Sequence, residues 1–148
     1  MTFNDFFIFS KIVAQTVSVR DTSLIEGDGT DMPDTLLFVV QRTDNTTSFG
    51  VTYCTADSTA FFYENDYERT SGQLFFAVSG SLTDTIKVPV VGDDKTELDE
   101  FMKVRLLSII SASGPTTIGD SVGIGSIINN DTSYVIVRDT CLIEGNAG

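Results

Sequence analysis

Carboxylates are the most abundant groups in this sequence that could do chemistry, and histidine is absent from all 148 residues. Aspartate and glutamate number 21 against nine lysines and arginines, which gives a formal net charge of −12. Without histidine there is no imidazole base, no Ser-His or Cys-His nucleophile pair and no His-ligated zinc. The composition therefore excludes most hydrolase mechanisms, and its negative charge makes nucleic acid a poor partner.

Carboxylates without histidine or cysteine nearby are ligands for hard cations. Such oxygen donors favour Ca²⁺ over zinc or copper, and Ca²⁺ accepts roughly six to eight oxygens from flexible loops. Neither Asp28-Gly29-Thr30-Asp31 nor Asp93-Asp94-Lys95-Thr96-Glu97 has the spacing of an EF-hand. A calcium site would therefore have to be assembled from distant loops. The alternative is that the acids only keep the surface soluble.

The elements that would position these acids are predicted to be β-strands, because apolar residues recur with a period of two. The segments Ile86 to Val90 and Met102 to Leu106 both show this alternation. Seven strands are predicted, near residues 17–25 with a break, 35–42, 49–55, 73–78, 85–91, 101–110 and 122–128. Short strands separated by turns indicate an all-β, antiparallel β-sandwich. Pro89 lacks a ladder donor, so its strand is expected at an edge.

Most of the acids fall in connections that are expected at the same end of the sandwich. If consecutive strands run antiparallel, the connections after the first, third and fifth strands share one end of the sandwich with the end of the seventh. Thirteen acids fall in those connections, and Asp131 follows the last strand. The thirteen are Glu26, Asp28, Asp31, Asp34, Asp57, Glu64, Asp66, Glu68, Asp93, Asp94, Glu97, Asp99 and Glu100. Two unit charges about 4 Å apart repel by ~1 kcal/mol in water and ~4 kcal/mol at a dielectric constant near 20, so a bound cation would relieve this end.

An internal repeat indicates how the chain is organised. The segment Val19 to Asp28 recurs as Val137 to Asn146, with eight identities in ten residues at an offset of 118. That offset is typical of whole domains in tandem rather than of solenoid repeats. We therefore expect an N-terminal extension at residues 1–15, a complete module at 16–132 and the start of a second, truncated repeat at 133–148.

Four motifs in order resemble a known family. They are Val17-Ser-Val-Arg-Asp-Thr-Ser-Leu-Ile-Glu26-Gly27, Thr55-Ala-Asp57-Ser-Thr-Ala60 with Asp66-Tyr67 and Gly72-Gln-Leu-Phe-Phe76, Val91-Gly-Asp93-Asp94-Lys-Thr-Glu97-Leu-Asp99-Glu100-Phe101, and Gly125-Ser-Ile-Ile-Asn129-Asn130-Asp131. Together they resemble the Calx-beta domain, found in the regulatory domains of sodium/calcium exchangers, in the integrin beta-4 tail and in tandem modules of large extracellular proteins. The resemblance implies an immunoglobulin-like β-sandwich that binds Ca²⁺ where the last strand leaves the domain.

The resemblance also implies a ligand set. The carboxylates at ligand or near-ligand positions are Glu26, Asp57, Asp93, Asp94, Glu97, Glu100 and Asp131, and the Lys95 carbonyl is a possible backbone ligand. The calcium-rich exchanger pattern has three acids where this chain reads Gly92-Asp93-Asp94, and three again where it reads Asn129-Asn130-Asp131. Three carboxylates are thus replaced by glycine or asparagine. We expect one or two ions, bound more weakly than a full four-ion cluster.

Three further features could suggest catalysis but are not expected to serve it. Asp66-Tyr67 is expected to pin the crossover after the third strand through hydrogen bonds. Cys54 is expected to point outward as an incidental thiol, since no base accompanies it. A carboxylate pair such as Glu97 and Glu100 could serve glycoside hydrolysis. Because the chain has no tryptophan and no aromatic cleft is indicated, that enzyme class is disfavoured.

The expected function is that of a non-enzymatic, calcium-binding module of a larger secreted or cell-surface protein, active in adhesion or cell communication. Its expected partners are calcium ions, neighbouring Calx-beta repeats of the same chain and other proteins at the cell surface. With Asp131 ending one module and Tyr134 beginning the next, a bound ion would stiffen the joint. Two alternatives stay open: a metal-free structural spacer or adhesion module, and a cytosolic Ca²⁺-sensing domain of a membrane transporter.

Overall fold

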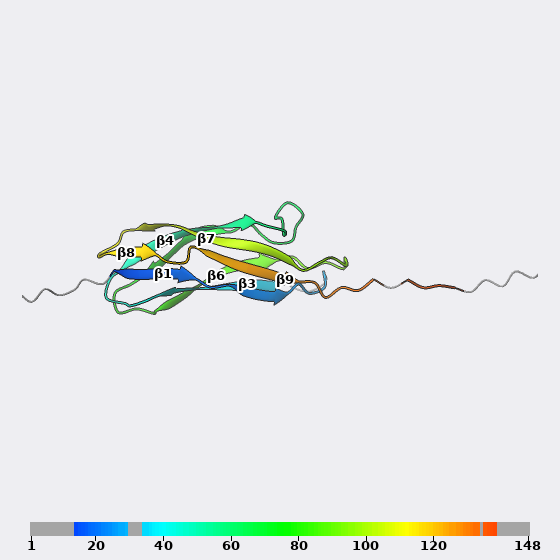
Figure 1. Cartoon of the computed structure of the whole chain (residues 1–148), viewed down its shortest axis with the longest axis horizontal. Helices are drawn as coiled ribbons and strands as arrows, with labels where there is room; N and C mark the ends of the chain where they lie inside the picture. Colours follow the sequence, from blue (N-terminus) through cyan, green and yellow to red (C-terminus); the bar gives the residue numbers. More distant parts are fainter. Residues whose placement is uncertain (1–13, 30–33, 134, 139–148) are drawn as a thin grey trace, which may run out of the picture.

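Alternating apolar side chains build two β-sheets whose inner faces pack together. The computed structural model describes residues 14–29, 34–133 and 135–138. One sheet has the order β6-β3-β1-β8 and the other the order β2-β9-β7-β4-β5, which form the two layers seen in Figure 1. The strands are β1 Gln15–Val19, β2 Thr22–Ile25, β3 Asp34–Arg42, β4 Phe49–Asp57, β5 Ser71–Phe76, β6 Thr83–Val90, β7 Glu100–Ile110, β8 Thr116–Ile118 and β9 Val122–Ile128. The predicted β-sandwich is confirmed, and no helix of the described residues has the length and apolar character of a membrane span.

The core lies between the two sheets. Phe38 of β3 and Val88 of β6 on one side, and Met102 and Val104 of β7 on the other, are fully buried. The layers approach most closely at Gly125 of β9, where an added Cβ would lie 2.6 Å from Cζ of Phe38. Burying these side chains is the main driving force for the fold, at about 25 cal/mol for each Å² of apolar surface removed from water.

At the predicted break in the first strand, the chain passes from one sheet to the other. β1 pairs with β3, whereas β2 pairs with β9 in the opposite sheet. The crossing is held by Arg20, whose backbone N–H donates to the Val39 carbonyl at 3.0 Å, and by Asp21, whose carboxylate accepts from the Ile124 N–H at 2.7 Å. As a result, β2 runs parallel to β9 and β1 runs parallel to β8. The sandwich is therefore not antiparallel throughout.

The pattern-based prediction misses one strand and places the end of another too late, while the other boundaries agree to within two residues. β8 is absent from the prediction because its three residues are too few to show a period. The fifth strand ends at Phe76 rather than at Val78, because the Ala77 carbonyl accepts a turn hydrogen bond from the Gly80 N–H at 3.1 Å. Ser79 in this turn has a φ of 57°, which a continuing strand could not accommodate.

β6 is an edge strand, as Pro89 predicts. Its open side is covered by the connection between β4 and β5. The Glu68 N–H donates to the Pro89 carbonyl at 2.9 Å, and the Val91 N–H donates to the Asp66 carbonyl at 3.1 Å. These bonds hold the connection that carries Asp66 against the edge of the sheet.

The ends of the sandwich differ in chemistry. The connections that follow β2, β4 and β6 and the segment that follows β9 all lie at the right-hand end in Figure 1. We call this end the acidic pole and define it by the described residues 26–29, 57–68, 91–100 and 129–133. The opposite end, the far pole, contains residues 43–48, 77–82 and 111–115. The predicted sorting of the loops is thus present in the fold.

Much of the predicted extension and second repeat lies outside the described residues. Gln15, assigned by sequence to the extension, already belongs to β1. Of the second repeat, residues 135–138 are exposed and outside both sheets. Asp31 and Cys141 also lie outside the described residues.

A buried cation organises the far pole. Arg42 is 1% exposed, and burial lowers the pKa of its guanidinium. The guanidinium donates to the carbonyls of Ser81, Thr47 and Ala77 at 2.9, 3.0 and 2.8 Å and lies 5.2 Å from the Phe76 ring centroid. One side chain therefore joins two loops through their backbone.

Replacing this guanidinium with an apolar side chain should destabilise the whole module. Arg42→Met leaves three carbonyls without their donors, and we expect a loss of roughly 3 kcal/mol in the free energy of unfolding. Urea denaturation would show this as a lower midpoint with an unchanged slope. Arg105→Met on the exposed face of β7 is the matched control; equal losses for the two variants would contradict the role given to Arg42.

Candidate metal centre

Three carboxylates from two connections meet at the acidic pole. Asp66 comes from the connection between β4 and β5, Glu97 from the connection between β6 and β7, and Glu100 is the first residue of β7. One oxygen from each lies within 4.8 Å of the other two. Calcium binds oxygens at roughly 2.3 to 2.6 Å, so ligands on opposite sides of one ion are about 5 Å apart. These three groups can therefore share a single ion.

Glu26 is a buried acid whose carboxylate interacts with this cluster through its charge. It follows β2 directly and is 8% exposed. Burial is the largest cause that raises its pKa to about 7, and the charges of Asp93 and Glu97 follow. No hydrogen bond contributes to this shift. Glu26 is thus a carboxylate held out of water, facing other carboxylates, without a compensating donor.

Glu100 is in a similar electrostatic position. Burial raises its pKa to about 7, followed by a hydrogen bond with Asp66 and by the charges of Asp66 and Glu97. Glu100 thus shares a proton with Asp66. A divalent cation bound beside it would instead stabilise its ionised form.

Asp131 brings the segment after β9 into the same region. Its Oδ2 atom is sealed from solvent and has no hydrogen-bond partner among the described residues. Burial raises the pKa of this carboxyl, and the charges of Asp28 and Asp94 raise it further. A buried oxygen without a hydrogen-bond donor or a cation lowers the stability of the fold. Since the donors gathered here are all oxygens, the residues present fit a hard cation such as Ca²⁺.

Lys95 is the cation that the described residues place among these acids. Its Nζ lies 3.2 Å from Oδ2 of Asp93 and 3.4 Å from Oε1 of Glu97. The Lys95 N–H also donates to Oδ1 of Asp93 at 2.7 Å, which is the largest cause that lowers the pKa of Asp93. One exposed ammonium group leaves most of the negative charge at this pole uncompensated.

Asp57 is used differently from the other predicted ligands. Its Oδ1 accepts from the Tyr67 hydroxyl at 2.6 Å and from the Phe62 N–H at 3.3 Å. Tyr67 is buried, and its pKa is raised by burial and by this hydrogen bond. Asp66 accepts from the Phe61 N–H at 2.6 Å. These bonds pin the crossover, as the sequence predicts for Asp66-Tyr67.

The structure thus sorts the predicted ligands into groups. Electrostatic contact joins five of them around one region: Glu26, Asp93, Glu97, Glu100 and Asp131. Asp94 is exposed and acts on Asp131 through its charge, while Asp57 is held by Tyr67. Asp66 belongs to the cluster although sequence reasoning treats it as structural. The position of Asp66 in an acidic connection indicated a ligand, but its pairing with Tyr67 in the sequence favoured a structural role.

Gly92 explains how two of the loops approach each other. A Cβ at this position would lie 2.4 Å from the Gly27 carbonyl oxygen and 2.8 Å from the Glu26 carbonyl oxygen. Such contacts with backbone atoms are too short for any side chain. Position 92 therefore has no room for a carboxylate, because the backbone there contacts the backbone of Glu26 and Gly27. This contact brings Glu26 close to the connection that carries Glu97.

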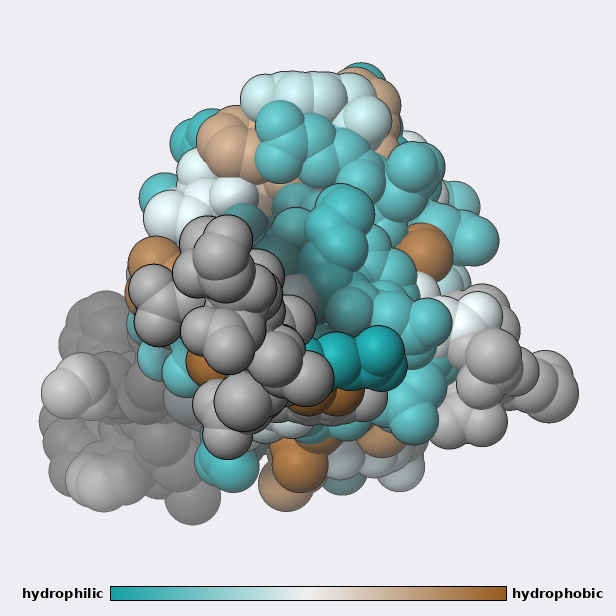
Figure 2. Space-filling view, turned by 90° about the vertical axis from the view of Figure 1, so that its right-hand side faces the viewer, coloured by the Kyte–Doolittle hydropathy of each residue, from teal (hydrophilic) through white to brown (hydrophobic). Residues whose placement is uncertain are grey.

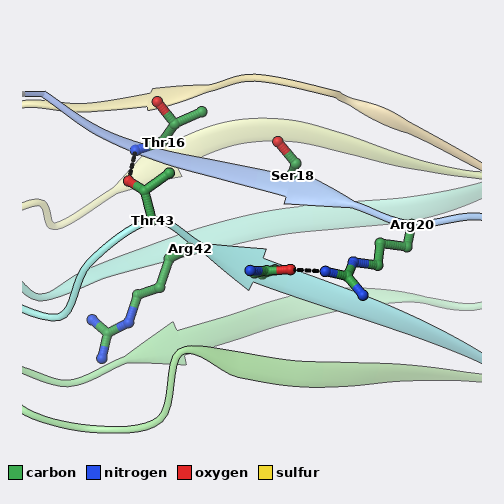
Figure 3. A pocket seen from close by; sticks show the side chains of 6 residues that line it. Thr16, Ser18, Arg20, Arg42 and Thr43 are labelled. Carbon is green, nitrogen blue, oxygen red and sulfur yellow. Dashed lines mark hydrogen bonds between the residues drawn. The ribbon is translucent and has the colours of Figure 1, made fainter.

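The surface of the acidic pole is hydrophilic and hollowed. Figure 2 looks onto this end and shows mostly hydrophilic residues around a depression. A separate hollow of about 200 Å³ lies over β1 and β3 (Figure 3). It is lined by Thr16, Ser18, Arg20, Gln41, Arg42 and Thr43. Arg20 donates to Gln41 there, and the lining residues include no nucleophile paired with a base. The clustered carboxylates therefore lie at the acidic pole and not in this hollow.

The raised pKa values predict an unusual pH dependence when a chelator keeps metal away. The folded state holds protons on Glu26 and Glu100 up to about pH 7, whereas the ordinary value is 4.5. Because the folded state binds more protons than the unfolded state between these values, the contribution of these two carboxyls to stability is fully present below pH 4.5 and is lost as the pH rises through 7. Melting temperatures measured across this range for the wild type and for Glu26→Gln would test this contribution. Relative to Glu26→Gln, the wild type should lose stability as the pH rises. If the melting temperatures of both rise by the same amount over the range, the proposed burial is contradicted.

Comparison with known proteins identifies a family and several related folds. A model of the Calx-beta domain matches residues 13–131. The crystal structure of the apo-form Calx CBD1 domain superposes with a TM-score of 0.68 at 22% identity, covering 80% of this chain and 100% of that domain. The Calx CBD2 domain gives a TM-score of 0.63 at 17% identity, covering 78% of this chain and 86% of that domain.

A two-domain relative also matches. The calcium binding domain CBD12 of CALX1.1 gives a TM-score of 0.64 at 23% identity, covering 78% of this chain but 46% of that protein. The curated protein sequences contain no match to the chain. These structural likenesses establish a shared sandwich fold, and the family match extends over most of the residues that build it. The chain therefore belongs to the Calx-beta domain family.

Proposed function

We propose that this chain is a non-enzymatic, calcium-binding Calx-beta module of a larger protein. The observation that carries the proposal is the meeting of Asp66, Glu97 and Glu100 within 4.8 Å beside the buried Glu26. Oxygen donors on separate loops are the arrangement that Ca²⁺ accepts and that zinc or copper sites do not use. The name of CBD12, a calcium binding domain of CALX1.1, supports the same ligand.

The proposed ion acts by removing repulsion. Ionised Glu26, Glu97 and Glu100 would surround it and supply the negative charge, while Asp131 would connect it to the segment that leaves β9. The repeated sequence aligns Ser133 with Gln15, the first residue of β1. Four residues, 129–132, therefore separate β9 from the expected first strand of the next module. An ion bound to such a short connection would stiffen the joint between modules.

The proposed setting follows from the repeat. A tandem array stiffened by calcium suits a secreted or cell-surface protein in adhesion or cell communication, whose partners are neighbouring repeats and other surface proteins. A cytosolic Ca²⁺-sensing domain of a transporter is a second candidate, favoured by the likeness to the Calx domains. A metal-free spacer would keep the fold and lose the ion. Calcium titration separates this last candidate from the other two.

Calcium should stabilise the module against unfolding. At a free concentration about 100 times its Kd, Ca²⁺ adds about 2.7 kcal/mol to the free energy of unfolding. Melting temperature measured in chelator and in excess Ca²⁺, together with calorimetric titration, would show the effect. No heat of binding and an unchanged melting temperature would leave only the spacer.

Two paired variants locate the site. Glu97→Gln with Glu100→Gln should abolish the calcium response, because it removes two of the three clustered carboxylates. Glu64→Gln with Glu68→Gln removes the same charge from exposed positions and should keep the response. Equal loss in both pairs would mean that the ion responds only to net charge.

A further inference from the structure

Two asparagine side chains join the loops of the acidic pole. Oδ1 of Asn130 accepts from the Gly27 N–H at 3.1 Å, and its Nδ2 donates to Oδ1 of Asp28 at 3.2 Å. Nδ2 of Asn129 donates to the Lys95 carbonyl at 2.9 Å, while its Oδ1 accepts from the Asp131 N–H at 2.7 Å. Each amide therefore uses both its donor and its acceptor.

The bonds made by these amides cross between segments that are distant in sequence. Asn130 binds the connection after β2, and Asn129 binds the connection between β6 and β7. The Asn129 N–H adds a third link by donating to Oδ1 of Asp99 at 3.2 Å. The segment after β9 is therefore fastened to two acidic loops by neutral groups.

The chemistry requires an amide at both positions. A carboxylate accepts hydrogen bonds and cannot donate to Asp28 or to the Lys95 carbonyl. An aspartate in place of Asn130 would also bring a second negative charge against Asp28. The amides hold the loops together without adding to the charge that separates them.

We propose that Asn129 and Asn130 are positioning residues that close the acidic pole in the absence of metal and hold its carboxylates ready for calcium. This inference rests on the proposed function and extends it. The pole also contains groups that await a ligand, namely the 8% exposed carboxylate of Glu26 and the sealed Oδ2 of Asp131. Closing the loops in advance lowers the ordering cost of binding, so the site needs fewer charged ligands to reach a given affinity.

The first test removes the amides. Asn129→Ala with Asn130→Ala, titrated calorimetrically with Ca²⁺ alone, should bind about tenfold more weakly, which corresponds to about 1.4 kcal/mol, because the loops that the lost side-chain hydrogen bonds held together must then be ordered on binding. Hydrogen exchange in chelator should also become faster at residues 27–29 and 95–99. A purely structural role would lower the melting temperature equally with and without Ca²⁺ and leave Kd unchanged, and that result would overturn the inference.

The second test changes an amide into a carboxylate. Asn130→Asp should lower the melting temperature in chelator and give a larger rise on adding Ca²⁺ than the wild type, because the ion then replaces the lost link. Asn45→Asp is the matched control, since Asn45 donates to the Gly80 carbonyl at the far pole. Identical calcium-dependent shifts in these two variants would contradict the positioning role.

The two proposals fail in different ways. If the wild type gives no heat and no shift with Ca²⁺, the proposed function is wrong and the positioning role falls with it. If the wild type binds Ca²⁺ and the double alanine variant binds it with the same Kd, only the role of the two asparagines is wrong.

Discussion

Repulsion between carboxylates is the constraint to which the acidic pole of this module responds. Glu26 is buried and Glu100 is half-buried, and both face other acids, so their pKa values rise to about 7. A buried charge without a partner is expensive, and a fold keeps such groups only when something compensates them. Here the compensation is partial within the chain, since Lys95 pairs with Asp93 and Glu97. The remaining charge is what the proposed cation would compensate.

The opposite ends of the sandwich solve the same problem in different ways. Loops must satisfy their backbone carbonyls and hold a fixed shape. At the far pole the guanidinium of Arg42 does this from inside, with three carbonyls as its acceptors. At the acidic pole the neutral amides of Asn129 and Asn130 join the loops, and the carboxylates are left for the proposed cation. The far pole thus has its cation built into the chain, whereas the proposed cation of the acidic pole would come from solution.

The position of the acidic pole matters for the proposed tandem arrangement. Asp131 acts through its charge on Glu26 and lies in the segment that leaves β9, which in the proposal leads towards a following repeat. Any change in charge at the cluster therefore acts directly on the segment that leaves the module. The short connection is the physical reason that a local ion could influence the arrangement of neighbouring domains.

The sequence by itself determined the strands, because the period of two in segments such as Ile86 to Val90 records which face is buried. It also determined the end at which the acids gather, because alternating strand direction places every second connection together. Only the tertiary structure decided how each acid is used. Asp57 ends β4 and Asp66 lies in the connection that follows it, yet Asp66 joins Glu97 and Glu100 while Asp57 accepts a hydrogen bond from the Tyr67 hydroxyl. The roles of Asn129 and Asn130 were likewise hidden, since hydrogen bonds between residues 34 to 103 positions apart depend on distances and directions of a few ångströms that no local pattern encodes.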